Sequence, residues 1–133
     1  KKIKLIQDCI ISHRYRNNHK PKTLEAKILF DADKLDSLGA IGIARAFVWV
    51  GKNKAHIYKK GRLDSYTRKN LGKSHNGRIM NKSKHSPQLE YETKMKYLPK
   101  KLYTPKAKKI SQERLNYFKN FLIRLEKEVR GEL

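Results

Sequence analysis

The feature that most constrains the fold is a run of apolar side chains at helical spacing close to the C-terminal end of the chain. They recur at intervals of three, four, three and four residues, at Leu115, Phe118, Leu122, Leu125 and Val129. This spacing places all five on one face of an α-helix, which other parts of the chain have to cover. Fewer than three heptads are present, so we predict a core-facing amphipathic helix rather than a coiled coil. Capping signals at Thr104–Pro105 and Gly131 delimit it to about 104–130.

Two further helices are predicted in the first third of the chain. The first has one face formed by Ile3, Ile6, Ile10 and His13. It is expected to run over about 2–16 and to end before Pro21, because a proline disfavours helical geometry in the residue that precedes it. Thr23 then serves as an N-cap for a second helix, which carries the sequence DADKLD in its second half.

A glycine- and alanine-rich helix follows directly, over the sequence AIGIARAFVW. Gly39, Gly42 and Ala46 fall on one side of it at spacings of three and four residues. Small residues at such positions let a second backbone approach closely. We therefore predict that 40–49 is among the most buried parts of the fold.

The segment 51–86 has no sustained apolar period and is rich in Lys, Asn, Gly and Ser. We predict a mostly irregular, basic insert that is either functional or mobile, because loops of this length are unusual in compact domains. Helix resumes near Pro87, with Leu89, Met95 and Leu98 as core candidates. The chain is therefore expected to be all-α, within one domain of 133 residues.

The net charge is +21, from 33 Lys and Arg against 12 Asp and Glu. Such a charge favours polyanionic partners, including nucleotides and nucleic acid. Of the 33 cations 24 are lysines, however, and lysine is a solvated point charge that is less specific for phosphate than arginine. A general lysine bias therefore explains the charge equally well, and the charge identifies no site.

Cys9 is the single cysteine, which excludes an internal disulfide and a cysteine-rich zinc site. No apolar run approaches the roughly 18 residues of a membrane span, and the chain opens without the pattern of a secretory signal. We expect a cytoplasmic protein without a membrane partner. Because the chain opens on Lys1 rather than Met, we take it as a piece of a longer protein.

Three of the 12 acidic residues lie together in the stretch DADKLD. Asp33 and Asp36 are three residues apart and share a helical face, whereas Asp31 points largely elsewhere. Asp31 and Asp36 are explained either by solvation or by pairs with neighbouring lysines. Asp33 lies closer to the packed small-residue segment, where a carboxylate needs a cation, hydrogen-bond donors or a metal as its partner.

His13 and Arg45 each allow two interpretations. An inward-facing histidine is usually a hydrogen-bonded structural residue, although His together with Asp also suits divalent Mn, Fe or Zn. Arg45 is explained by an ion pair with an aspartate or by a forked hydrogen bond to a phosphate. The sequence contains no phosphate-binding glycine loop, HExxH or GxSxG motif, and no signature of an RNA-stacking sheet.

Two long stretches resemble the HD superfamily of metal-dependent phosphohydrolases. The first is HRYRN followed by KTLEAKILFDADKLDSLGAIGIARAF, and the second is YETKMKYLPKKLYTPKAKKISQERLNYFKNFLIRLEKEVRGEL. The closest likeness is to a small soluble branch with nucleotide pyrophosphohydrolase-like members. It covers nearly the whole chain except about 51–86, and it implies an HD-domain-like helical bundle that contains a long basic insert.

The resemblance assigns roles to seven residues of this chain. Asp33 matches the last metal-ligating aspartate of the family, and His13 matches a histidine that faces the pocket, where it has a catalytic role toward a phosphate, a water or a second metal. Asp31 and Asp36 become neighbours that orient the metal site. The predicted phosphate contacts are Arg45, Lys34 and Lys94.

The chain departs from the family in one respect, because it contains no His-Asp dipeptide. The family's earlier histidine and its His-Asp pair lie upstream of the helix that carries His13. We therefore expect 1–133 to be a partial HD domain that is incomplete at its N-terminal side. One aspartate and one histidine do not hold a catalytic divalent ion, which usually needs three or more protein ligands. The complete domain is expected to bind Mn, Mg, Fe or Zn, and this chain alone is expected to be inactive.

The resemblance thus implies a parent protein that hydrolyses a nucleotide phosphate ester or anhydride, or another phosphorylated small molecule. The alternative is a non-catalytic basic helical module that binds nucleotides or nucleic acid through its charge. A third interpretation is a structural remnant without a ligand. Absence of the upstream helices is also expected to uncover apolar surface around Ile6, Ile10 and the Gly39–Gly42 side, which favours self-association.

Overall fold

The structure is a computed structural model that describes residues 1–14, 19–72 and 77–133. Its α-helices are α1 (Lys2–Ser12), α2 (Leu24–Leu35), α3 (Gly39–Lys52), α4 (Leu63–Asn70), α5 (Pro87–Thr93), α6 (Leu98–Lys101) and α7 (Pro105–Val129). Two short 3-10 turns complete it, η1 (Lys82–Lys84) and η2 (Met95–Tyr97). Within these ranges the chain forms no strand, so the predicted all-α bundle is confirmed.

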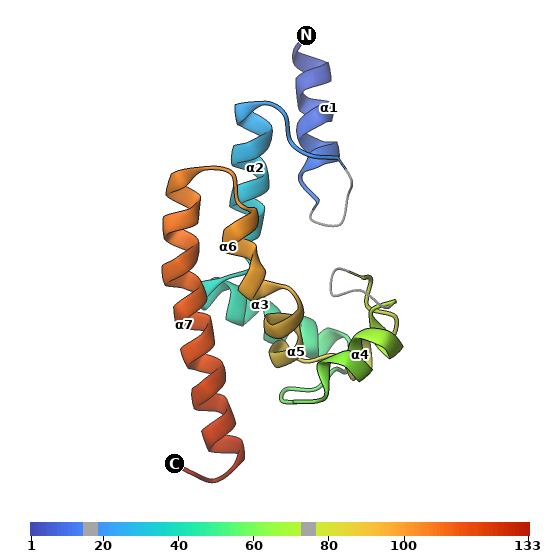
Figure 1. Ribbon diagram of the computed structural model, residues 1–133, viewed down its shortest axis with the longest axis vertical. Helices are drawn as coiled ribbons and strands as arrows, with labels where there is room; N and C mark the ends of the chain where they lie inside the picture. The colour runs from blue at the N-terminus through green and yellow to red at the C-terminus, as the bar shows by residue number, and fades with distance from the viewer. Residues whose placement is uncertain (15–18, 73–76) are drawn as a thin grey trace.

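The long helix α7 runs along one side of the bundle, with α2, α3, α5 and α6 packed against it (Figure 1). The first helix, α1, packs against α2, and α4 lies on the side of the bundle away from α7 (Figure 1). In the described part of the chain, none of the helices combines the length and the apolar character needed to cross a membrane.

The main core forms where α7 meets α3 and the segment that follows α5. Its buried members are Leu38, Met95, Leu98, Phe118 and Leu122. A smaller cluster of Phe30, Leu102 and Ala107 joins α2 to the start of α7. The Thr104 hydroxyl accepts a hydrogen bond from the Ala107 amide at 3.3 Å, so the predicted cap of this helix is confirmed.

The prediction that 40–49 is among the most buried segments is wrong. Gly42 is buried there, but the Ile41 and Val48 side chains are 53% and 72% exposed. The reason is that α3 is covered by α7 on one face, through contacts such as the edge-to-face pair of Phe47 and Phe121, while much of its other face is open. A close backbone approach does occur at Gly42, but from the turn that precedes the same helix, where a Cβ atom would lie 2.3 Å from the Ser37 carbonyl oxygen.

The first helix is shorter than predicted, because α1 ends at Ser12; residues 15 and 16 of the predicted range lie outside the described residues. Its apolar stripe is exposed, with Ile6 at 56% and Ile10 at 58%. The expected open surface therefore exists on α1. It does not extend to Gly39 and Gly42, which are buried.

In its described residues, the insert 51–86 contains α4 and η1. Two hydrogen bonds join the first part of the insert to its last residues, just before α5. The His56 amide donates to the His85 carbonyl at 3.0 Å, and the Ser86 hydroxyl donates to the Lys59 carbonyl at 2.9 Å. The two ends of the insert are therefore held together where α5 begins.

Candidate functional site

Asp31, predicted to orient a metal site, instead connects α2 to the start of α7. Its buried carboxylate accepts hydrogen bonds from the amides of Tyr103 (2.9 Å) and Thr104 (2.8 Å), and from the Thr104 hydroxyl (2.7 Å). The Thr104 hydroxyl thus both caps α7 and binds Asp31. These contacts give Asp31 a structural role, which differs from both interpretations that the sequence allowed, solvation and a pair with a neighbouring lysine.

Asp33 and His13 are brought into one neighbourhood by Lys34. The buried Lys34 ammonium donates to the Asp33 carboxylate at 2.5 Å and to the His13 backbone carbonyl at 2.8 Å. Burial lowers the pKa of Lys34 and the charge of Lys94 lowers it further, while the bond to Asp33 opposes this. The His13 ring nitrogen Nδ1 lies 2.5 Å from the Ile10 carbonyl of its own helix. Hydrogen bonds from Lys34 therefore connect Asp33 to the backbone of His13.

These residues do not by themselves fit a divalent metal. The Asp33 oxygen nearest Lys34 is already covered by an ammonium group. Among the residues that the structure describes, no group of three His, Cys, Asp or Glu side chains is arranged to hold a metal ion.

Asp36 and Arg45 form an exposed ion pair, with 3.4 Å between Oδ2 and Nη1. Both side chains are more than half exposed, so the pair contributes at most about 1 kcal/mol. The ion pair is one of the two interpretations that the sequence allowed for Arg45. It leaves the guanidinium accessible to a stronger anion.

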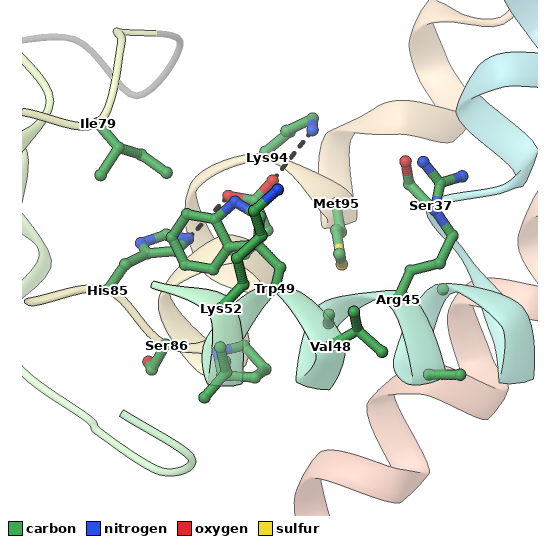
Figure 2. Close-up of a pocket in the computed structure, with 16 residues that line it drawn as sticks. Ser37, Arg45, Val48, Trp49, Lys52, Ile79, His85, Ser86, Lys94 and Met95 are labelled. Carbon is green, nitrogen blue, oxygen red and sulfur yellow. Dashed lines mark hydrogen bonds and ion pairs between the residues drawn. The ribbon is translucent and has the colours of Figure 1, made fainter. Parts of the chain in front are cut away.

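A pocket of about 580 Å³ lies between α3 and the residues around α5 (Figure 2). The residues that α3 contributes along one stripe are Arg45, Val48, Trp49 and Lys52. The opposite wall includes His85, Glu90, Lys94 and Met95. Of the seven residues assigned by resemblance, Arg45 and Lys94 line this pocket, whereas the other five are not among its lining residues.

The wall formed by His85, Glu90 and Lys94 is hydrogen-bonded throughout (Figure 2). The Glu90 carboxylate lies 3.0 Å from His85 Nε2 and 3.0 Å from the Lys94 ammonium. Burial alone would raise the pKa of Glu90, but the hydrogen bond from His85 and the charge of Lys94 lower it to about 2. Glu90 is therefore an ionised carboxylate that is held between two partners.

Sequence reasoning missed His85, Glu90, Trp49 and Lys52 as pocket residues. His85 precedes a helix in a segment without a period, which carries no signal of burial. The spacing of Arg45, Trp49 and Lys52 was the available signal, because steps of four and three residues place them on one face of α3.

The pocket combines three cationic side chains, Arg45, Lys52 and Lys94, with one carboxylate, Glu90. Apolar side chains form much of the remaining wall, among them Val48, Trp49, Ile79 and Met95. Its volume is within the roughly 300–1,000 Å³ of small-ligand sites. Such a pocket suits an anion that also carries an apolar or aromatic part.

No protein-family model matches the chain. The chain is 28% identical over 111 residues to YpgQ of Bacillus subtilis (strain 168), which is named as an uncharacterized protein; the match covers 84% of this chain and 43% of YpgQ. A crystal structure of a Lactobacillus plantarum protein superimposes with a TM-score of 0.72 at 21% identity, over 97% of this chain and 59% of that one. The crystal structure of the Lin1889 protein of Listeria innocua superimposes with a TM-score of 0.60 at 29% identity, over 96% of this chain and 54% of that one. The chain thus spans about half the length of these proteins.

Proposed function

We propose that this chain is part of a metal-dependent phosphohydrolase of the HD superfamily, which acts on a nucleotide phosphate ester or anhydride. In this proposal the chain supplies the substrate's phosphate-binding pocket. The observation that carries it is the meeting of Arg45 and Lys94. Both were assigned to phosphate by resemblance, they belong to different elements, and they line the same pocket.

The pocket residues have complementary parts in this proposal. Arg45 presents a planar fork that matches two phosphate oxygens, and a phosphate replaces Asp36 as its partner. Lys94 and Lys52 add point charges that neutralise further oxygens. Trp49 offers an aromatic surface to the base or sugar of the substrate.

A divalent Mn, Mg, Fe or Zn ion would supply an activated water when bound in the complete protein. Asp33 is the proposed ligand from this chain, and His13 is the proposed catalytic side chain near it. Because no group of three His, Cys, Asp or Glu side chains in the described residues is arranged to hold a metal, the remaining ligands are expected from other parts of the protein or from a second chain. We therefore expect this chain by itself to bind substrate without hydrolysing it.

Calorimetric titration with ATP, without added metal, tests the pocket directly. Replacing Arg45 with alanine is expected to weaken binding about tenfold or more, because a charge-assisted forked hydrogen bond is lost. Arg124→Ala is the matched control, because it removes the same charge from a residue that pairs with Glu128 on the exposed surface of α7. Equal affinities in the two variants would contradict the assignment of the pocket.

The charge of +21 favours a second candidate function, a non-catalytic module that binds nucleic acid or nucleotides. Its signature is a steep loss of affinity with salt that increases with the length of the oligonucleotide, irrespective of Arg45. ATP binding that depends on Arg45 and exceeds the affinity for a short oligonucleotide favours the phosphohydrolase.

A further inference from the structure

We propose that His85 is a positioning residue, which holds Lys94 at the pocket through Glu90 and connects it to the α4 helix. The proposal rests on the proposed function, because it concerns the same anion-binding pocket. It adds a set of residues outside the pocket on which the affinity for the anion depends.

The first step is the contact between Glu90 and Lys94. These residues are four apart, and the Lys94 ammonium donates to Glu90 Oε1 at 3.0 Å. Glu90 is partly buried and ionised, so the direction of its carboxylate determines where the ammonium is held. The position of Lys94 therefore depends on what orients Glu90.

The second step is the contact between Glu90 and His85. His85 Nε2 lies 3.0 Å from Glu90 Oε2, the oxygen that does not bind Lys94. The His85 ring is 3% exposed and is confined by two aromatic rings. Tyr66 stacks on it at 5.8 Å between centroids, and Trp49 meets it edge-on at 5.5 Å. Since the ring is buried and contacts both aromatic rings, it is a fixed donor to Glu90.

The third step joins His85 to α4. Its other ring nitrogen, Nδ1, is hydrogen-bonded to the Tyr66 hydroxyl. The Asn70 amide donates to the same hydroxyl oxygen at 3.1 Å. A neutral imidazole satisfies both bonds, with Nε2–H donating to Glu90 and Nδ1 accepting from the Tyr66 hydroxyl. Because the ionised Glu90 carboxylate can only accept, it fixes the proton on Nε2, and the Tyr66 hydroxyl donates to Nδ1 and orients the ring.

Asn70 anchors the end of this hydrogen-bonded network that lies farthest from Lys94. Its side-chain oxygen accepts from the Asn81 amide at 2.7 Å, and its backbone oxygen accepts from the Met80 amide at 2.9 Å. Hydrogen bonds thus run without interruption from Asn70 through Tyr66, His85 and Glu90 to Lys94. Tyr66 is not among the residues that line the pocket, and its hydroxyl contacts His85, so we expect an effect of Tyr66 on ligand affinity to pass through His85.

The experiment is a double-mutant cycle with inorganic pyrophosphate as the probe, measured by calorimetry at several salt concentrations. Tyr66→Phe retains the stacked ring and removes the hydroxyl. We expect it to weaken pyrophosphate binding about fivefold, the effect of one lost hydrogen bond. Lys94→Met should weaken binding more strongly and lower the salt slope. In the Tyr66→Phe/Lys94→Met double variant, the Tyr66 change should have no further effect.

Tyr117→Phe is the matched control, because this tyrosine is 56% exposed on α7. His85→Gln, which keeps a side-chain amide donor for Glu90, should recover part of the affinity that His85→Leu loses. Additive effects of Tyr66→Phe and Lys94→Met would overturn the proposal, and so would unchanged affinity in Tyr66→Phe.

A second measurement separates this proposal from the proposed function. The side-chain ammonium signal of Lys94 is observed by nitrogen-15 NMR in the protein without ligand, assigned by its absence in Lys94→Met. We expect Tyr66→Phe to shift this signal and to speed its hydrogen exchange, whereas Tyr117→Phe should not. If the chain without substitutions binds no pyrophosphate, the assignment of the pocket to an anion fails. The Lys94 ammonium signal then still decides whether His85 positions Lys94. An unchanged signal in Tyr66→Phe would refute the positioning.

Discussion

Replacement of Asp31 by alanine should destabilise the fold more than any other single change in the acidic stretch. The carboxylate is 2% exposed and accepts three hydrogen bonds, two of them from the backbone amides of Tyr103 and Thr104. Alanine leaves these donors without a partner at the junction between α2 and α7. An unsatisfied buried donor costs about 1–3 kcal/mol. With two amides affected, we expect a loss of about 4 kcal/mol in the free energy of unfolding.

The expected change is large against the roughly 5–15 kcal/mol stability of a typical domain. At about 2.1 cal/mol/K per residue, the entropy of unfolding of 133 residues is about 280 cal/mol/K. A loss of 4 kcal/mol then lowers the Tm by about 14 °C. Urea and thermal unfolding followed by far-UV circular dichroism measure both quantities.

Asp36→Ala is the matched control, because Asp36 forms an exposed pair with Arg45. It removes the same charge from the same stretch and should cost less than about 1 kcal/mol. If Asp31→Ala lost no more stability than Asp36→Ala, the connection between α2 and α7 through Asp31 would be refuted.

Two other predictions concern Glu90 and the glycines of α3. The pKa of Glu90 in the folded protein is about 2, below its ordinary value of 4.5. The ionised carboxylate therefore contributes about 3 kcal/mol to the free energy of unfolding above pH 4.5, and this contribution is lost as the pH falls toward 2. Urea unfolding at several pH values should show that Glu90→Gln abolishes this part of the pH dependence of stability. An unchanged slope of stability against pH would contradict the lowered pKa of Glu90. Gly42→Ala should destabilise by about 1–3 kcal/mol, since its Cβ would lie 2.3 Å from the Ser37 carbonyl oxygen. A Cβ atom at Gly51 would have no neighbour within 4 Å, so Gly51→Ala should stabilise the helix by up to about 1 kcal/mol. Equal changes in stability for Gly42→Ala and Gly51→Ala would refute this reasoning.

The ends of the helices were predicted from the sequence where short-range hydrogen bonds determine them. Thr23 caps α2 by accepting from the Ala26 amide at 3.2 Å, three residues away. Thr104 does the same for α7, and Gly131 follows its last turn with a φ of 68°. Each interaction spans a few residues, so the residue types themselves carry the information.

Two residues of the candidate pocket were singled out from the sequence, and their phosphate-binding role stays a prediction. Arg45 and Lys94 do share a pocket, which the likeness to a known family suggested and the spacing of residues alone did not. The contacts of Asp31 were not predicted. A cation was one of the partners that the sequence allowed for Asp33, but the sequence did not identify Lys34. Asp31 reaches Tyr103 and Thr104, more than 70 residues along the chain, and no local pattern encodes such a partner.

By itself the sequence determined the helical class, the apolar face of each main helix and the positions of the caps. Only the tertiary structure decided which of those faces is covered. The stripe of α1 and the outer face of α3 are as apolar as predicted, yet Ile6 and Val48 remain exposed while Phe118 of α7 is fully buried. Periodicity records the direction in which side chains point along a helix. Burial, and with it the contact of His85 with Glu90 and Tyr66, depends on which helices the folded chain places opposite that face.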